Sequence, residues 1–204
     1  VPFWNKNSYK LMLHSRGVDY FDENMVPLVD SPAGIEAIKE LKKQVDKYSP
    51  PEAKSAIWDT AYDFMMKGKL AMLLAWASLK KSCEAAGLGE KVKNTLSPGF
   101  PTKDGRTRHA SHVGQTHMFF VNKYSKHPEA AFAILTYWAD PAVSAKVVCD
   151  AAGFYEPFRV CHFDDPEVQK SYGGKYYTDV LKEAFDYFTP DYNLVGAPEY
   201  DDSL

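Results

Sequence analysis

The sequence predicts an α/β or helix-rich α+β fold, because several helical patterns alternate with only two short apolar runs that could be strands. Two of the helical patterns begin with a side chain that can cap a helix, followed directly by proline, at Ser31-Pro32 and at Asp140-Pro141. The candidate strands contain the apolar residues 70–74 and 118–121.

The first two predicted helices have clear ends. Residues 4–15 form the first, and Gly17 is placed to end it. The second begins at Ser31 and ends at Pro50-Pro51. Its apolar residues recur every three or four positions, which predicts one buried face. That face comprises Ile35, Ile38, Leu41, Val45 and Tyr48.

A helix, a turn and a strand are expected to follow one another from residue 58 to residue 75. Gly68-Lys69 is similar to part of a phosphate-binding loop, but Asp63 and Leu70 stand where that motif requires Gly and Ser or Thr. We therefore expect a turn at this pair, followed by a buried strand over residues 70–75.

The second half of the chain is predicted to contain one longer strand and several helices. The strand covers residues 111–122 and is buried at 118–121, where nearly every residue is apolar. The helices are predicted at 79–86, 127–138, 140–150 and 175–188, with a short one starting at Asp165-Pro166. We expect the buried side of the 127–138 helix to comprise Ala130, Ala131, Ile134, Leu135 and Trp138.

Composition excludes several classes of function. The chain has 204 residues, of which 45% are hydrophobic and 25% charged, as in globular proteins. The formal net charge is −3 and there is no long basic run, which argues against nucleic acid as the main partner. No run of about eighteen apolar residues is present, so direct membrane insertion is not expected.

Catalytic and metal-binding patterns have little support. His109, His112 and His117 lie in and just before the predicted 111–122 strand, where odd separations place His112 on the face opposite to the other two. His109 and His117 share a face but would lie roughly 26 Å apart, at about 3.3 Å per residue. We therefore expect no metal, no cofactor and no enzymatic activity. Neighbouring acids such as Asp22-Glu23 and Asp164-Asp165 are typical of solvated loops and helix caps.

Three cysteines are present, without a CxxC pair. Cys149 and Cys161 flank one loop, and the sequence allows either a disulfide between them or two free thiols.

Three loops carry the features that suggest ligand binding. Trp76 follows the predicted 70–75 strand and offers a flat apolar face, although a tryptophan in this place is more often part of a core. Gly114-Gln115 interrupts the second strand, which indicates either close approach of a ligand or a bulge. Tyr155 and Arg159 share the loop 153–159, where the arginine could equally bond backbone groups inside the fold.

The order of the motifs resembles the C-terminal half of the family 1 extracellular solute-binding proteins of bacterial ABC importers, which are related to maltose-binding protein. Each motif is weak alone, but six in the right order are fairly specific. The matching pieces are Ser31-Pro32-Ala33-Gly34, Phe64-x-x-x-Gly68-Lys69-x-Ala71-Met72-x-x-x-Trp76, Leu96-Ser97-Pro98-Gly99-Phe100-Pro101, Gly114 to Asn122 with Ser125-Lys126-x-x-x-Ala130-Ala131, Asp140-Pro141 with Gly153-x-x-x-Pro157-x-Arg159, and Val195-Gly196-Ala197-Pro198-Glu199-Tyr200. The chain departs from the family's pattern at Gln115, where a second Gly is common, and in one extra residue before Gly68.

The resemblance implies a periplasmic-binding-protein-like fold of type II, in which two α/β lobes close over a ligand. It implies that residues 1–204 are the C-terminal portion of such a protein, truncated at both ends, with candidate lobe crossings near 112–118 and 153–160. The implied ligand-binding residues are Trp76, Gly114, Gln115, Tyr155 and Arg159.

The expected function is therefore the extracytoplasmic substrate-binding component of an ABC importer, binding a sugar or polyol between two lobes. Its partners would be that small molecule and the membrane permease. Its location would be periplasmic or extracellular, with a lipoprotein anchor in a Gram-positive organism. The alternatives are a glycoside hydrolase or other carbohydrate-active enzyme, and a purely structural or interaction module.

Overall fold

The computed structural model describes residues 5–102, 104–112, 118–190, 195, 196 and 199. The chain divides into two compact units. Unit 1 contains residues 1–75, 96–115 and 184–204, and unit 2 contains residues 76–95 and 116–183. The chain thus passes from one unit to the other at 75/76, 95/96, 115/116 and 183/184, and the whole of 153–160 lies within unit 2.

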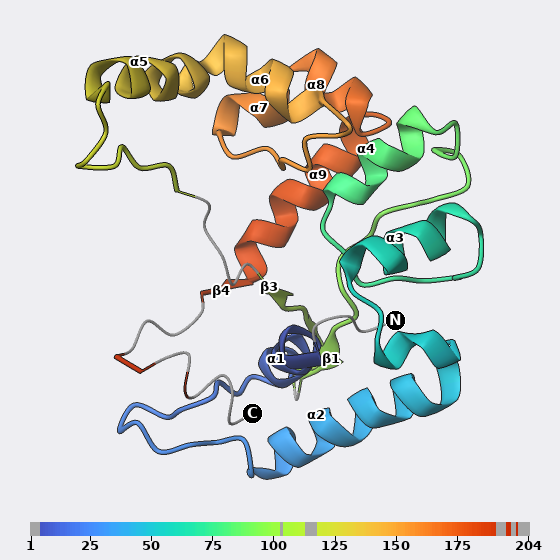
Figure 1. Cartoon of the computed structure of the whole chain (residues 1–204). Helices are drawn as coiled ribbons and strands as arrows, with labels where there is room; N and C mark the ends of the chain where they lie inside the picture. The colour runs from blue at the N-terminus through green and yellow to red at the C-terminus, as the bar shows by residue number, and fades with distance from the viewer. Residues whose placement is uncertain (1–4, 103, 113–117, 191–194, 197–198, 200–204) are drawn as a thin grey trace. The chain divides into compact units, whose positions relative to one another are not determined.

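Unit 1 is built around a pair of contacting helices, α1 (Asn5–Ser15) and α2 (Pro32–Lys43) (Figure 1). Gly17 adopts a φ of +80° after α1, and the amides of Gly17 and Val18 bond the carbonyls of His14 and Leu13. This glycine-ended helix terminus confirms the predicted end of the helix. At the start of α2, the Ser31 side chain accepts from the Gly34 amide at 3.2 Å, which confirms the predicted cap.

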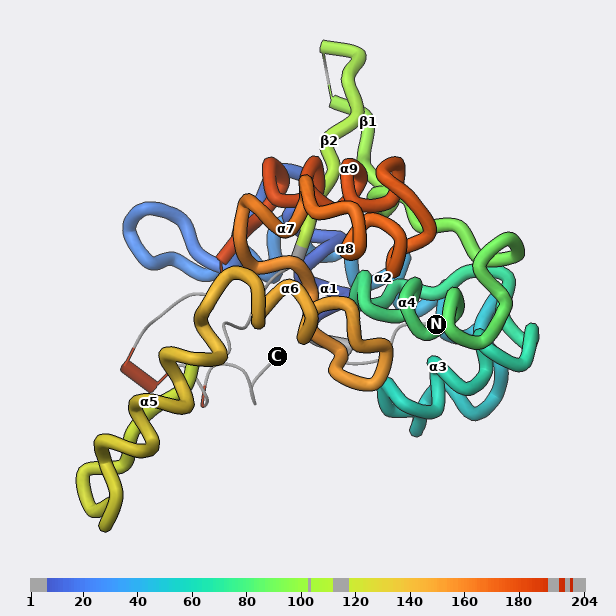
Figure 2. Tube along the Cα trace, turned by 90° about the horizontal axis from the view of Figure 1, so that it is seen from above, coloured from blue at the N-terminus to red at the C-terminus, as the bar shows by residue number. Residues whose placement is uncertain are grey.

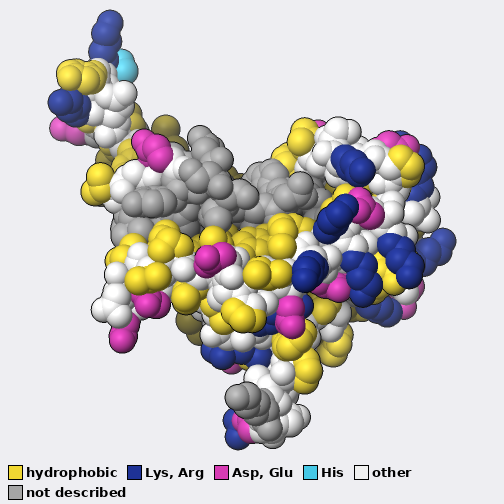
Figure 3. Space-filling view, turned by 90° about the horizontal axis from the view of Figure 1, so that it is seen from below, with side chains coloured by type: hydrophobic (Ala, Val, Ile, Leu, Met, Phe, Trp, Pro, Cys, Tyr) yellow, Lys and Arg dark blue, Asp and Glu magenta, His cyan; other side chains and the backbone are white. Residues whose placement is uncertain are grey.

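The buried face of α2 differs from the predicted one. Gly34, Ala37 and Leu41 are buried, whereas Ile35 and Ile38 are 43% and 50% exposed. Small residues are buried on this face because α2 lies close to the preceding chain. A Cβ on Gly34 would stand 2.1 Å from the Val29 carbonyl oxygen. Ala37 and Leu41 then pack with Tyr9, Leu13 and Tyr20 in the core of unit 1. Figure 3 views the molecule from the side on which α2 lies, and shows hydrophobic side chains beside lysine and arginine.

Short elements complete unit 1. After α2 come a π-helix η1 (Gln44–Tyr48), a 3-10 helix η2 (Pro51–Lys54) and α3 (Trp58–Met66). Strands β1 (Phe100–Pro101) and β2 (Thr107–Arg108) form an antiparallel hairpin (Figure 2). Strands β3 (Ser111–His112) and β4 (Phe188–Thr189) pair in parallel, and a 3-10 helix η3 (Phe185–Tyr187) precedes β4.

Gly68-Lys69 forms the predicted turn, and the structure shows what each of the two residues contributes to it. Gly68 has a φ of +69°, and the amides of Gly68 and Lys69 bond the carbonyls of Met65 and Phe64 at the end of α3. The Lys69 ammonium lies 4.8 Å from the centre of the Phe64 ring. The motif therefore ends a helix.

Both of the longer predicted strands are wrong for the residues that the structure describes. Residues 70–75 follow the turn without forming a strand, and Met72 is 82% exposed. Among the described residues of the predicted 111–122 strand, Ser111–His112 pairs and 118–122 do not, and Met118, Phe119 and Phe120 are 66%, 55% and 78% exposed. An apolar run becomes a strand only where a neighbouring strand can satisfy its backbone groups.

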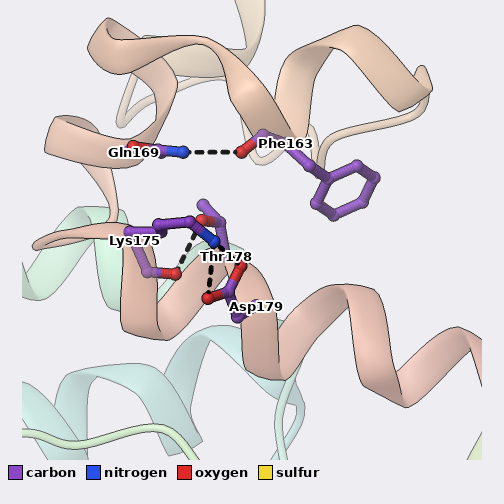
Figure 4. A network of polar contacts seen from close by, with 5 residues as sticks. All are labelled: Phe163, Gln169, Lys175, Thr178 and Asp179. Atoms are coloured by element: carbon purple, nitrogen blue, oxygen red, sulfur yellow. Dashed lines mark hydrogen bonds and ion pairs between the residues drawn. The ribbon is translucent and has the colours of Figure 1, made fainter.

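Unit 2 consists of helices. They are α4 (Ser78–Ala85), α5 (Pro128–Ala139), α6 (Pro141–Cys149), α7 (Val160–Asp164), α8 (Pro166–Ser171) and α9 (Lys175–Ala184). The core contains Val148, Val168, Tyr172 and Tyr177, with Ala77 and Tyr155 packed against it. Figure 4 shows how Gln169 bonds the Phe163 carbonyl at 2.9 Å, which joins α8 to α7, and how Lys175 pairs with Asp179 within α9.

Helix α5 is not the core helix that the sequence predicts. None of its residues is buried, and Ile134 and Trp138 are 64% and 37% exposed. Figures 1 and 2 show α5 extending away from the start of α6, and among the described residues of unit 2 no other helix lies along it. The part of the chain that the structure describes is helix-rich with few short strands, as predicted.

Candidate ligand-binding site

Three of the five predicted ligand-binding residues lie in the described part of unit 2. Trp76 is 39% exposed and lies two residues before the first residue of α4, while Tyr155 and Arg159 are half-buried in the loop between α6 and α7. Gly114 and Gln115 lie outside the described residues.

The structure brings the segments of Trp76 and Tyr155 together. Ala77 and Tyr155 pack against the same cluster of Val148, Val168, Tyr172 and Tyr177. The Ser78 amide donates to the Glu156 carboxylate at 3.0 Å, so the start of α4 is joined to the residue that follows Tyr155. Two ring-bearing residues that are far apart in the sequence are thus held by neighbouring backbone segments.

Lys81 adds a second connection between α4 and this loop. Its side chain is buried, and its ammonium donates to the carbonyls of Val148, Asp150 and Tyr155 at 2.6, 3.0 and 2.9 Å. Burial lowers the pKa of Lys81, and the nearby acids Glu156 and Asp150 oppose that shift. The Tyr172 hydroxyl also donates to the Tyr155 carbonyl, at 3.4 Å.

A row of aromatic rings continues from Tyr155. The Trp138 ring lies 5.9 Å from the Tyr155 ring at 85°, and the Phe119 ring lies 5.3 Å from Trp138 at 82°. These edge-to-face contacts are favourable arrangements of aromatic rings. Sequence reasoning assigned Trp138 and Phe119 to buried surfaces and missed this row. The aromatic residues at the end of α5 were the available signal.

Arg159 is held by the protein itself. Its guanidinium donates to the Ala139 carbonyl at the end of α5, and its Nε is buried with no partner within the described chain. The alternative of an arginine bonding backbone inside the fold therefore describes the geometry of this side chain. A contact with ligand would use the donors that remain.

Other candidate groups lie elsewhere. The Nδ1 atom of His109 donates to the Ser97 carbonyl at 2.8 Å, in unit 1. All three cysteines are free thiols, including Cys149 and Cys161. In the part of the chain that the structure describes, no three His, Cys, Asp or Glu side chains are grouped to hold a metal ion.

A shallow apolar hollow of about 540 Å³ lies on α5, and none of the predicted site residues lines it. Its lining comprises Val121, Pro128, Glu129, Phe132, Ala133 and Thr136. No helix among the described residues is long and apolar enough to cross a membrane.

The described aromatic rings and buried polar contacts of unit 2 thus gather at the start of α4 and in the loop between α6 and α7. Comparison with known families gives a match between residues 3–145 and the bacterial extracellular solute-binding protein family. The chain belongs to this family. No curated protein and no solved structure gives a significant match. Membership makes the chain a solute-binding protein of the bacterial extracellular type, a class that is typically non-enzymatic and works with ABC permeases.

Proposed function

We propose that this solute-binding protein is the extracytoplasmic substrate-binding component of an ABC importer and that its ligand is a sugar or polyol. The observation that carries the proposal is the placing of the Trp76 segment and Tyr155 on one cluster, with Trp138 beside Tyr155. Aromatic faces suit the apolar C–H surfaces of a sugar ring, and a few oriented polar groups suit its hydroxyls.

The charges beside the rings support an uncharged ligand. Lys81 donates to three carbonyls, which accounts for all three N–H donors of an ammonium group. Arg159 donates to the Ala139 carbonyl. Both cations are thus bonded to backbone carbonyls within unit 2, Lys81 through all three of its donors and Arg159 through part of its guanidinium, which favours an uncharged solute over an anionic one.

The resemblance to the sugar-binding members of the family supplies the remaining features of the proposal. They are a two-lobed fold of type II, direct ligand contacts from Gly114 and Gln115, and a periplasmic or extracellular location, lipoprotein-anchored in a Gram-positive organism. The partner would be the membrane permease of the importer.

The proposal is tested by ligand screening followed by calorimetry. We expect a sugar or polyol to raise the melting temperature of the protein in a thermal-shift panel that also contains amino acids and organic anions. Trp76→Ala is then expected to weaken binding by about 1–3 kcal/mol, the value of a stacking aromatic, which is about 5- to 150-fold in affinity.

Tyr48→Ala serves as the control, because Tyr48 is a 64% exposed aromatic residue of unit 1. Affinity unchanged by Trp76→Ala in a folded protein would remove Trp76 from the site. Stabilisation by anions alone would refute the sugar assignment. Hydrolysis of a glycoside that is lost in a single Asp or Glu variant would replace the binding function with an enzymatic one.

A further inference from the structure

Lys81 is a buried charge whose hydrogen bonds within the described chain go to backbone carbonyls, while its ammonium also lies 5.7 Å from the centre of the Tyr172 ring. Its side chain is 1% exposed, and its three hydrogen bonds go to the carbonyls of Val148, Asp150 and Tyr155. Burying an ammonium group is unfavourable unless its donors are satisfied, and here all three are. The side chain is therefore fixed by the position of those three carbonyls, and it fixes them in turn.

Two of the three acceptors belong to the end of α6. Helix α6 ends at Cys149, so the carbonyls of Val148 and Asp150 lie where a helix leaves its carbonyl groups without intrahelical partners. A cation at this end also meets the negative end of the helix dipole. The third acceptor, the Tyr155 carbonyl, lies five residues further on, so Lys81 ties the loop back to the helix end.

The neighbouring Lys80 shows that this arrangement is specific to position 81. Lys80 is also buried, but its ammonium pairs with Glu84 at 2.6 Å and donates to the carbonyls of Gly89 and Val92, both at 2.8 Å. It also lies 4.2 Å from the centre of the Tyr177 ring. The ion pair and hydrogen bonds of Lys80 thus join α4 to the chain that follows it, and its ring contact is with α9, whereas the hydrogen bonds of Lys81 join α4 to the end of α6 and to the loop that carries Tyr155.

A buried lysine can also act as an amine nucleophile, but the geometry argues against this role for Lys81. A nucleophilic amine needs a free lone pair and access to a substrate carbon. The Lys81 nitrogen is surrounded by three carbonyl oxygens and is not exposed. Its surroundings favour a fixed cation.

We propose that Lys81 is a positioning residue of the candidate site, which holds the backbone of residues 150–155 so that Tyr155 presents its ring to the ligand. The ligand part of this inference rests on the proposed function, whereas the positioning of the loop does not. The Ser78–Glu156 hydrogen bond acts in the same direction, because it joins the start of α4 to the next residue of the loop.

Hydrogen exchange followed by mass spectrometry tests the positioning. In Lys81→Met, we expect the amides of residues 150–159 to exchange about tenfold or more faster than in the wild type, because the loop loses its anchor. Lys80→Met is the matched control, since it removes an equally buried cation of the same helix but leaves these carbonyls bonded. Unchanged exchange at 150–159 in Lys81→Met, or equal acceleration in Lys80→Met, would overturn the proposal.

A measurement on the wild type applies even where Lys81→Met does not fold. Under brief treatment with acetic anhydride, we expect Lys81 to be modified about tenfold or more slowly than Lys42, which is exposed, because modification requires the loop to open. Modification of Lys81 at the rate of Lys42 would show that the three-carbonyl contact does not persist in solution.

A double-mutant cycle separates positioning from a general loss of stability. With maltose and with sorbitol as probes, we expect Lys81→Met to weaken binding about tenfold in the wild-type background and by less than about twofold in the Tyr155→Ala background. An undiminished loss without the Tyr155 ring would show that Lys81 does not act through that residue. Absence of binding by the wild type would count against the proposed function, while the exchange experiment would still decide the positioning.

Discussion

The corrected face of α2 leads to a prediction with an internal control. Leu41 and Ile38 both belong to the apolar pattern read from the sequence, but Leu41 is 5% exposed and Ile38 is 50% exposed. Leu41→Ala and Ile38→Ala therefore remove aliphatic side chains of equal size from opposite kinds of environment in one helix.

The expected free energies of unfolding follow from burial. Leu41→Ala removes three buried carbon atoms, worth about 0.8 kcal/mol each, and the cavity brings the total loss to about 2–4 kcal/mol. Ile38→Ala loses only about half of the free energy that burying these carbon atoms would contribute, because the side chain is half-exposed, and it leaves no enclosed cavity. The higher helix propensity of alanine returns a few tenths of a kcal/mol. Its loss is expected to stay under about 1 kcal/mol.

The assay must report on unit 1, because two compact units can unfold separately. Urea denaturation with pulsed hydrogen exchange, read on peptides from α1 and α2, meets this need. If Ile38→Ala lowered the free energy of unfolding by as much as Leu41→Ala or more, the buried face of α2 would be the one predicted from the sequence. That result would refute the packing described above.

Three further predictions concern pH and close packing. His162 is buried with Nε2 at 2.9 Å from the Ser144 hydroxyl, and burial and the Arg159 charge lower its pKa below 6.5 against the opposing effect of Asp165. The unfolded chain therefore binds the proton more readily, so the wild type is expected to lose stability as the pH falls from about 7 to about 5. In urea denaturation, the free energy of unfolding of His162→Gln should depend less on pH over this range. Equal pH dependence in the two proteins would contradict this. Because burial lowers the pKa of Lys81 below 10.5, the stability of the wild type relative to Lys81→Met is expected to rise as pH increases toward that value, and a constant difference would contradict the shift. Gly34→Ala places a carbon 2.1 Å from the Val29 carbonyl oxygen and is expected to cost about 1–3 kcal/mol in chemical denaturation, whereas a gain in stability, the usual result of Gly→Ala in a helix, would show that the contact relaxes freely.

The helices were predictable because their signals are local. Ser31 and Asp140 accept hydrogen bonds from the first amides of α2 and α6, as their positions before proline predict. Gly17 and Gly68 end α1 and α3 with positive φ. Each signal needs only the few residues around it, so the sequence contains all the information that the element requires.

The strands and the buried faces were harder because they depend on distant partners. The apolar residues 118–121 fit a strand in composition, but the structure gives them no pairing neighbour. On α2, hydrophobicity favoured Ile35 and Ile38, while close approach of the chain at Val29 selected the smaller residues Gly34 and Ala37. Neither the pairing nor the approach is encoded in the segment that it affects.

The same difference between local signals and distant contacts applies to the residues of the candidate site. Trp76 and Tyr155 could be singled out from the sequence because each is an aromatic residue in a loop next to a predicted element, and the family resemblance then implied their role as ligand contacts. Lys81 cannot be found in this way, because two adjacent lysines on a helix are normally a solvated surface. In the structure both are buried, yet one pairs with Glu84 within its own helix and the other joins three carbonyls that lie about seventy residues away in the chain. The residues found from the sequence are those proposed to face a ligand, and the residue proposed to position one of them becomes visible only when the chain has folded.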